Sequence, residues 1–145
     1  MAASARHDDT RRLLRARDVM DRDYAGPLDI AALARSVYFS RAHFIRSFRA
    51  AFGETPGRYL QRRRIERAMA LLRQTDRSVT EICFDVGFTS LGTFSRTFGE
   101  ILGMSPTAYR ERTRALARVK VPSCFAMKFN RPSSTFGEAG RRLRD

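Results

Sequence analysis

The chain has 145 residues, with 28 Lys and Arg against 15 Asp and Glu, so its formal net charge is +13. This length suits one domain or two very small ones, and a hydrophobic content of 43% is enough for a buried core. No segment approaches the roughly 18 uninterrupted apolar residues of a membrane span, and the N-terminus lacks a hydrophobic signal segment. We therefore expect a cytoplasmic protein whose basic charge suits an anionic polymer or surface.

Enzyme chemistry has little support in this sequence. The two cysteines, Cys83 and Cys124, are too few for a disulfide framework and lack the paired spacing of a zinc site. The two histidines, His7 and His43, have no Cys or Glu nearby at ligand spacing. Glycine-rich phosphate loops, nucleophile elbows and His-Glu-x-x-His motifs are all missing. The sequence predicts a protein that is not an enzyme and that needs neither a cofactor nor a metal.

Helical signals run from residue 8 to residue 118. Polar capping residues and apolar residues at helical spacing predict about seven helices, of which the first spans residues 8–24. The expected starts of the other six, in chain order, are Asp29, Ser40, Thr55, Ser78, Thr89 and Ser105. Residues 56–75 contain no helix breaker and predict one continuous helix roughly 30 Å long. The expected fold is all-α.

Two segments of the chain repeat each other. Residues 30–59 match residues 79–109 at eleven positions, with a single one-residue shift between the fifth and sixth match. The matched pairs are Ile30/Val79, Leu33/Ile82, Val37/Val86, Phe39/Phe88, Ser40/Thr89, Phe44/Phe94, Arg46/Arg96, Phe48/Phe98, Gly53/Gly103, Pro56/Pro106 and Tyr59/Tyr109. Each copy contains two short helices joined by a turn of a few residues, which is the pattern of a helix-turn-helix.

This repeat predicts four segments. Residues 8–55 hold the N-terminal helix and the first helix-turn-helix, residues 56–75 form a linker helix, and residues 76–118 hold the second helix-turn-helix. Residues 119–145 contain prolines, glycines and serines without a helical period. We expect this C-terminal tail to be mostly irregular.

The second copy resembles the signature of a known family. Its segments Gly87-Phe88-Thr89-Ser90, Phe94-Ser95-Arg96-Thr97-Phe98, Gly103-Met104-Ser105-Pro106 and Tyr109-Arg110 are similar to those of the AraC/XylS transcription regulators. The resemblance covers about residues 10–115. It implies a DNA-binding transcription regulator, usually an activator, with two recognition helices in successive major grooves. The chain looks most like the stand-alone members of the MarA and SoxS type, which bind DNA as monomers.

The resemblance also assigns DNA contacts to particular residues. Those expected to face base edges are Ala42, Ile45 and Arg46 in the first copy and Leu91, Gly92, Thr93, Ser95 and Arg96 in the second. Among them Arg46 and Arg96 are the long donors that can make a bidentate contact with guanine. From their charge or their place at helix starts, and not from the resemblance, the residues expected to contact the DNA backbone are Ser40, Arg41, His43, Arg49, Arg58, Arg62, Arg63, Thr89, Ser90 and Arg110. An arginine on a basic helix can also be a solvated side chain, and for Arg96 a structural or phosphate-only contact is the alternative.

Geometry favours one chain per site. Dimeric regulators place two recognition helices about 34 Å apart, and one chain with two units joined by a helix of roughly 30 Å spans a similar distance. Because the two units differ in sequence, we expect an asymmetric site. Double-stranded DNA is the expected partner, in the nucleoid, and RNA polymerase is a further candidate. The alternatives are a non-specific basic nucleic-acid-binding protein and the DNA-binding fragment of a larger ligand-responsive regulator.

Overall fold

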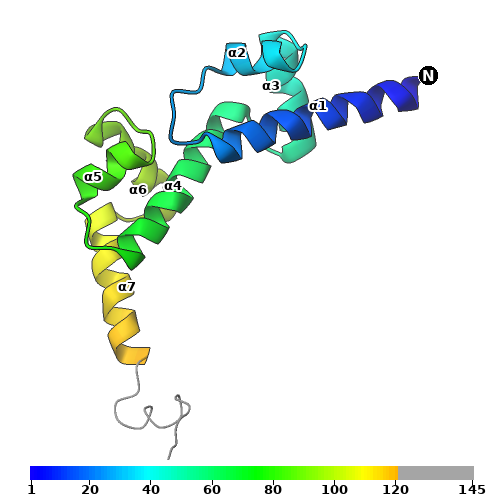
Figure 1. Cartoon of the computed structure of the whole chain (residues 1–145). Coiled ribbons are helices and arrows are strands. Elements are labelled where there is room, and N and C mark those ends of the chain that lie inside the picture. Colours follow the sequence, from blue (N-terminus) through cyan, green and yellow to red (C-terminus); the bar gives the residue numbers. More distant parts are fainter. Residues whose placement is uncertain (121–145) are drawn as a thin grey trace, which may run out of the picture. The chain divides into compact units, whose positions relative to one another are not determined.

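The computed structural model describes residues 1–120, and this part of the chain contains seven helices and no strand (Figure 1). The helices are α1 (Ala2–Arg22), α2 (Ile30–Ser36), α3 (Arg41–Phe52), α4 (Pro56–Gln74), α5 (Val79–Asp85), α6 (Leu91–Leu102) and α7 (Pro106–Lys120). The predicted all-α class is confirmed. Residues Met1–Tyr109, which include both helix-turn-helix units, form one compact region. A second region begins at Arg110, within α7.

Polar side chains cap most of these helices, as the sequence predicts. The Ser40 hydroxyl accepts a hydrogen bond from the backbone N–H of His43 at 3.2 Å, which satisfies one free donor at the start of α3. Thr55 caps α4 in the same way, directly before a proline at the first helical position. At α5 the expected start Ser78 forms a capping box with Glu81, because each side chain accepts from the other residue's backbone N–H. The helices therefore begin where local chemistry favours a start.

The starts of two helices differ from the prediction. Helix α1 begins at Ala2 rather than at Asp8, because the preceding residues are rich in alanine, the strongest helix former, and contain no breaker. Helix α6 is capped by Ser90, whose hydroxyl accepts from the N–H of Thr93, and not by Thr89. The turn of the second copy is thus one residue longer than that of the first.

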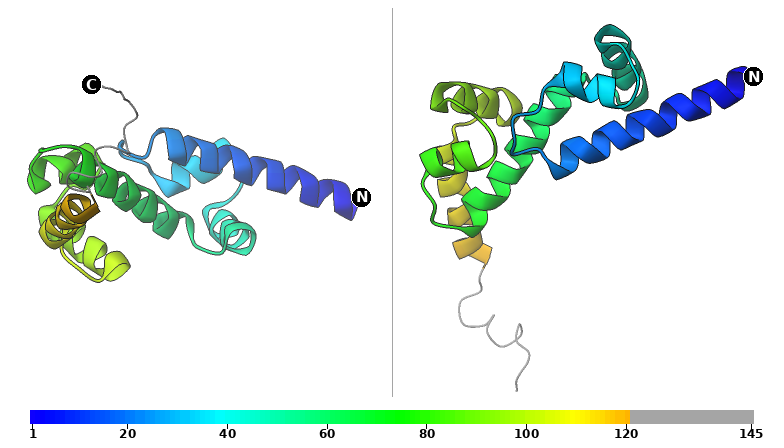
Figure 2. Two further views of the ribbon diagram at one scale, coloured as in Figure 1. Left: turned by 90° about the horizontal axis from the view of Figure 1, so that it is seen from below. Right: turned by 45° about the horizontal axis from the view of Figure 1, so that its top comes forward.

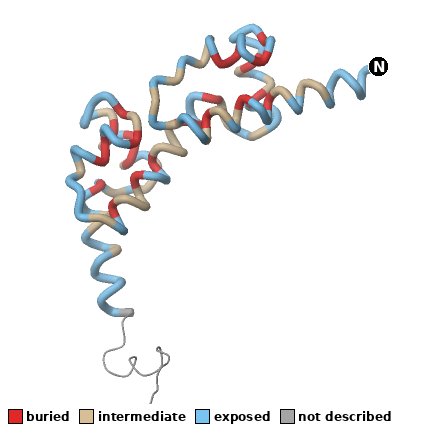
Figure 3. The backbone as a smooth tube through the Cα atoms, viewed as in Figure 1, coloured by how far each residue is buried: buried red, intermediate tan, exposed pale blue. Residues whose placement is uncertain are grey.

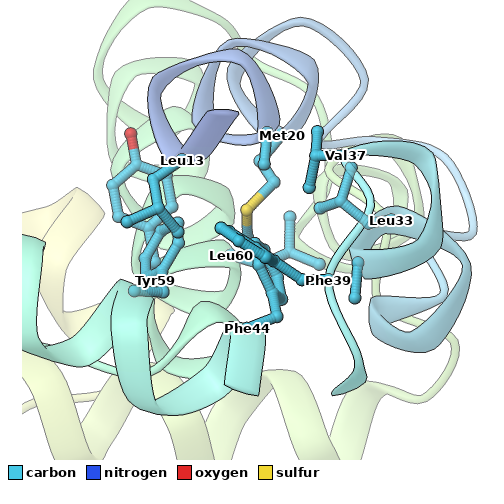
Figure 4. Packing of buried hydrophobic residues seen from close by; sticks show 11 residues of the cluster. Leu13, Met20, Leu33, Val37, Phe39, Phe44, Tyr59 and Leu60 are labelled. Atoms are coloured by element: carbon cyan, nitrogen blue, oxygen red, sulfur yellow. The ribbon is translucent and has the colours of Figure 1, made fainter. Parts of the chain in front are cut away.

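The hydrophobic core has two parts, which share α4. The first lies among α1, α2, α3 and the N-terminal half of α4 (Figures 3 and 4). The second joins the C-terminal half of α4 to α5 and α6. Leu60 belongs to the first part and Ile65 to the second, so the change occurs within about one turn of α4. Figure 2 shows α4 passing between the two groups of helices.

The repeat in the sequence is also a repeat in packing. In the first copy Phe44 contacts Phe48, and Phe48 contacts Tyr59, with each pair of ring centroids 5.6 Å apart. In the second copy the chain of rings is Phe94, Phe98 and Tyr109, with centroid distances of 5.8 and 5.7 Å. These aromatic contacts are the common core of both helix-turn-helix units.

The structure describes the start of the expected tail and one of the two cysteines. Val119 and Lys120 extend α7, whereas residues 121–145 of the expected irregular tail lie outside the described residues, as does Cys124. Cys83 is fully buried, and burial raises the pKa of its thiol. Among residues 1–120, no helix has the length and apolar character needed to cross a membrane.

Candidate nucleic-acid interface

Helix α3 presents its polar side to solvent. The ring of Phe44 is fully buried on one side, and Ala42 and Arg46 are exposed on the other. Ile45 is half-buried between these faces. The amphipathic spacing that places Phe44 and Phe48 in the core therefore turns the predicted base-facing residues outward. Three further side chains on this helix that were expected to contact phosphates, Arg41, His43 and Arg49, are exposed as well.

Helix α6 offers a smaller and less charged surface. Leu91, Gly92 and Arg96 are exposed, whereas Thr93 and Ser95 are half-buried. The Ser90 hydroxyl donates to the Thr93 hydroxyl at 3.0 Å, so both groups take part in the helix cap. A Cβ atom at Gly92 would meet no atom within 4 Å, which leaves the start of this helix open to a close approach.

Arg46 and Arg96 occupy equivalent positions in the two copies, and both lie on the solvent side of their helix. Both side chains are exposed, and within residues 1–120 neither makes an ion pair or a hydrogen bond to another side chain. Each guanidinium therefore keeps its donor groups for a ligand. A planar fork of this kind matches the two acceptors of guanine in the major groove.

Arg62 and Arg63, which were expected to contact phosphates, have partners inside the protein. Arg62 pairs with Glu54 at 2.6 Å and with Glu66 on the next turn of α4. Arg63 pairs with the same Glu66 and with Asp21 of α1, each at about 3 Å. The two arginines thus link α1, α4 and the α3–α4 turn, a role that the sequence did not predict.

Hydrogen bonding and burial shift the pKa values in this network. The hydrogen bond to Glu54 raises the pKa of Arg62. For Arg63, burial opposes the charged form, but hydrogen bonds to Glu66 and Asp21 outweigh it and raise the pKa. The hydroxyl of Tyr59 donates to Asp21 at 2.6 Å, and burial together with this bond raises the pKa of Tyr59 to about 12. These groups stabilise one packing of α4 against α1.

The remaining predicted backbone contacts lie at helix starts. Ser40 and Ser90 are exposed caps, and Thr89 is exposed in the preceding turn. Arg58 is exposed in the first turn of α4. Arg110 is half-buried and belongs to the region of the chain that begins at this residue. Four of these five residues are therefore accessible at the N-terminal ends of helices, where backbone N–H groups favour anions.

Two of the three acidic residues of the second copy already have partners within the protein. Glu81 takes part in the capping box of α5, and Asp85 pairs with Arg77 at 2.5 Å. Glu100 is exposed on α6. The carboxylates of α5 are therefore compensated locally, which lessens their repulsion of a nearby phosphate.

Known proteins share this arrangement. A family model described as "Helix-turn-helix domain" matches residues 33–112, which is more than half of the chain. The regulatory protein SoxS of Salmonella typhimurium is 36% identical over 86 residues, a match that covers 59% of this chain and 80% of SoxS.

The chain belongs to the AraC/XylS family of transcription regulators.

Longer relatives and solved structures agree with this family. The MmsAB operon regulatory protein of Pseudomonas aeruginosa is 37% identical over 87 residues, which are 60% of this chain but only 28% of that protein. The DNA-binding domain of AdpA, a global transcriptional factor solved with a target DNA, has a TM-score of 0.70 and 33% identity. That match covers 73% of this chain and 96% of the AdpA domain. The family and the fold are those of DNA-binding transcription regulators.

Proposed function

We propose that this AraC/XylS chain regulates transcription by binding an asymmetric site in double-stranded DNA, with α3 and α6 in successive major grooves. The observation that carries the proposal is the pair of exposed arginines, Arg46 and Arg96, without protein partners among residues 1–120 and at equivalent positions of the two units. The AdpA domain, solved with its target DNA, supports duplex DNA as the ligand class.

The two half-sites should differ because the two recognition helices differ. Arg46 and Arg96 are the shared donors, but their neighbours are not alike. Ile45 corresponds to Ser95, and Arg41 corresponds to Leu91. Apolar side chains such as Ile45 and Leu91 suit thymine methyl groups, whereas Ser95 can exchange a hydrogen bond with a base. The site is therefore asymmetric, and one chain occupies it.

Contacts with the DNA backbone set the register of each helix. For the first unit we propose Ser40, Arg41, His43 and Arg49, with Arg58 at the start of α4. For the second unit we propose Thr89, Ser90 and Arg110. Arg62 and Arg63 are assigned to the fold, since Glu54, Glu66 and Asp21 occupy the guanidinium donors that a phosphate would need.

Regulation requires a connection to the transcription machinery. We propose an activator that contacts RNA polymerase while bound as a monomer, in the cytoplasm and on the nucleoid. The similarity to the regulatory protein SoxS, 80% of which the match covers, supports the regulatory role. A second candidate is the DNA-binding part of a longer, ligand-responsive regulator, which the MmsAB relative favours because this chain matches only 28% of its length.

Selection of bound duplexes from a random pool tests the proposal. We expect two different half-sites whose centres lie about 10 base pairs apart, one turn of the duplex. A palindromic site would contradict binding by one chain. Enrichment of no sequence, together with equal affinity for random duplexes, would identify a non-specific DNA-binding protein instead.

A further inference from the structure

One arginine of α4 contacts both halves of the molecule. The Nε atom of Arg64 donates to the backbone carbonyl of Tyr24 at 2.7 Å, and a terminal nitrogen donates to the carbonyl of Gly26 at 2.8 Å. Both carbonyls belong to the connection between α1 and α2. The guanidinium carbon also lies 6.0 Å from the ring centroid of Phe88, which is part of the second helix-turn-helix. Arg64 thus connects the α1–α2 loop on the side of the first helix-turn-helix with the α5–α6 turn of the second.

Gly87 brings the two units into direct contact. Its φ is +102°, and a Cβ atom built on it would lie 2.8 Å from Nε of Arg64. The same Cβ would lie 3.0 Å from the carbonyl oxygen of Tyr24 and 3.1 Å from that of Ala25. Side chains do not normally approach so closely, so any residue other than glycine would push the α5–α6 turn away from the α1–α2 connection.

The first copy provides an internal comparison for this glycine. Tyr38 occupies the position equivalent to Gly87, between residues that match Val86 and Phe88, and it also has a positive φ, of 65°. Its side chain is 82% exposed. The turn therefore accepts a bulky residue where the space outside it is open. At Gly87 the backbone conformation and the close approach of Arg64 and the α1–α2 connection both require glycine.

The surroundings of Arg64 support a structural junction. Tyr24 packs against both parts of the hydrophobic core, so the α1–α2 connection touches each of them. Burial lowers the pKa of Arg64, and the two backbone carbonyls offset part of that cost. Neither carbonyl belongs to a helix, so these acceptors would otherwise depend on water.

We propose that Arg64 and Gly87 hold the two helix-turn-helix units in one relative orientation and so determine the spacing between the half-sites that the protein accepts. The continuous helix α4 sets the separation of the units. Apolar contacts and ion pairs hold each unit or its neighbouring segments to α4, but they do not join one unit directly to the other, so by themselves they allow rocking about the helix. The junction adds directional hydrogen bonds and a close backbone contact that oppose this motion. Arg64 is therefore a positioning residue for DNA binding, and this inference rests on the proposed function.

Spacing preference is the first readout. Inserting or deleting one base pair between the half-sites moves them by about 3.4 Å and rotates them by about 35°. We expect the unmodified protein to bind the selected spacing at least tenfold more tightly than either altered spacing. Arg64→Met retains an apolar side chain beside Phe88 but loses both hydrogen bonds. We expect the affinity ratio between the selected and the altered spacing to fall below threefold in this variant. Arg67→Met removes an exposed charge from the same helix, and this matched control should keep the ratio.

A second pair of variants separates close contact from backbone strain. Gly87→Ala introduces a Cβ atom into the junction, and we expect it to reduce the spacing preference as Arg64→Met does. Gly53→Ala places alanine at a similar positive φ, +84°, where a Cβ would meet nothing within 4 Å. This control should destabilise the protein without changing the preference. Equal spacing ratios for Gly87→Ala and Gly53→Ala would contradict the junction.

A distance measurement without DNA keeps this inference distinct from the proposed function. Spin labels on Cys residues introduced at Ala50 of α3 and Glu100 of α6, both exposed, report the separation of the units in a Cys124→Ser background. We expect a narrow distance distribution that at least doubles in width with Arg64→Met and stays narrow with Arg67→Met. An unchanged width with Arg64→Met would overturn the junction even if DNA binding is sequence-specific. If no duplex sequence is preferred, the proposed function fails while the distance measurement still tests the junction.

Discussion

Replacing Arg46 or Arg96 by alanine separates base reading from general attraction to DNA. Both side chains are exposed and, within residues 1–120, make no ion pair, so their removal breaks no ion pair of the fold. Arginine and alanine are both good helix formers, so α3 and α6 should remain folded. A good bidentate contact with guanine discriminates by about 1–3 kcal/mol, which corresponds to roughly 5- to 150-fold in affinity. Each variant should lose this discrimination in its own half-site alone.

The assay is a binding-site selection with each variant, followed by affinity measurements on duplexes mutated in one half-site. Arg49→Ala is the matched control, because it removes the same charge from the exposed side of α3. We expect it to weaken binding to all duplexes and to reduce the salt slope by about 0.9. If Arg46→Ala and Arg96→Ala behave like this control and keep the wild-type preference in both half-sites, the arginines contact phosphates and the base-reading assignment is wrong.

The two half-sites should contribute unequally to specificity. Next to Arg96, α6 presents Leu91 and Gly92, whereas α3 presents further cationic side chains at Arg41 and Arg49. We therefore expect the Arg46→Ala selection to lose more sequence information than the Arg96→Ala selection.

Three further variants test the fold that supports the interface. Arg62→Met leaves Glu54 and Glu66 without this partner, so we expect the free energy of unfolding in denaturant to fall by about 1 kcal/mol. The salt slope of DNA binding should change by less than about 0.5, and a drop of about one would indicate a phosphate contact. Tyr38→Gly relieves a positive φ at an exposed side chain and should raise the free energy of unfolding by about 0.5–1 kcal/mol, whereas a matching gain with Tyr38→Ala would exclude backbone strain as the cause. Burial and the hydrogen bond to Asp21 raise the pKa of Tyr59 from 10.0 to about 12 in the folded protein. The neutral hydroxyl therefore adds to the free energy of unfolding below pH 10, and this addition is lost as the pH rises toward 12. The unfolding temperature of Tyr59→Phe should therefore fall less steeply between pH 10 and 12 than that of the unmodified protein. An identical fall in both proteins would contradict a stabilising role of the Tyr59 hydroxyl.

Local patterns predicted the helices well because the same residues that favour a helix start also cap it in the fold. Ser40, Thr55 and Ser78 have short polar side chains directly before apolar residues at helical spacing, and each one caps a helix. The repeat predicted the two cores because its matched positions are mostly core aromatic and aliphatic residues. The Ser90 cap was missed because Thr89 and Ser90 are chemically similar neighbours.

Contacts between distant segments could not be predicted in this way. The run from Arg62 to Arg64 looks uniform in the sequence, yet Arg62 and Arg63 pair with carboxylates and Arg64 with backbone carbonyls. These partners lie up to 42 residues away, and no local period records them. The positions of Arg46 and Arg96 were predictable because the repeat places them opposite buried phenylalanines.

The number of chains bound to one DNA site shows whether both helix-turn-helix units of a single chain bind it together. Sedimentation of the complex with a minimal duplex that contains both half-sites measures this number. We expect one chain per duplex, because α3 and α6 already supply two recognition helices on a continuous polypeptide. Two chains per minimal duplex would contradict the account, since each chain would then use only one of its helix-turn-helix units.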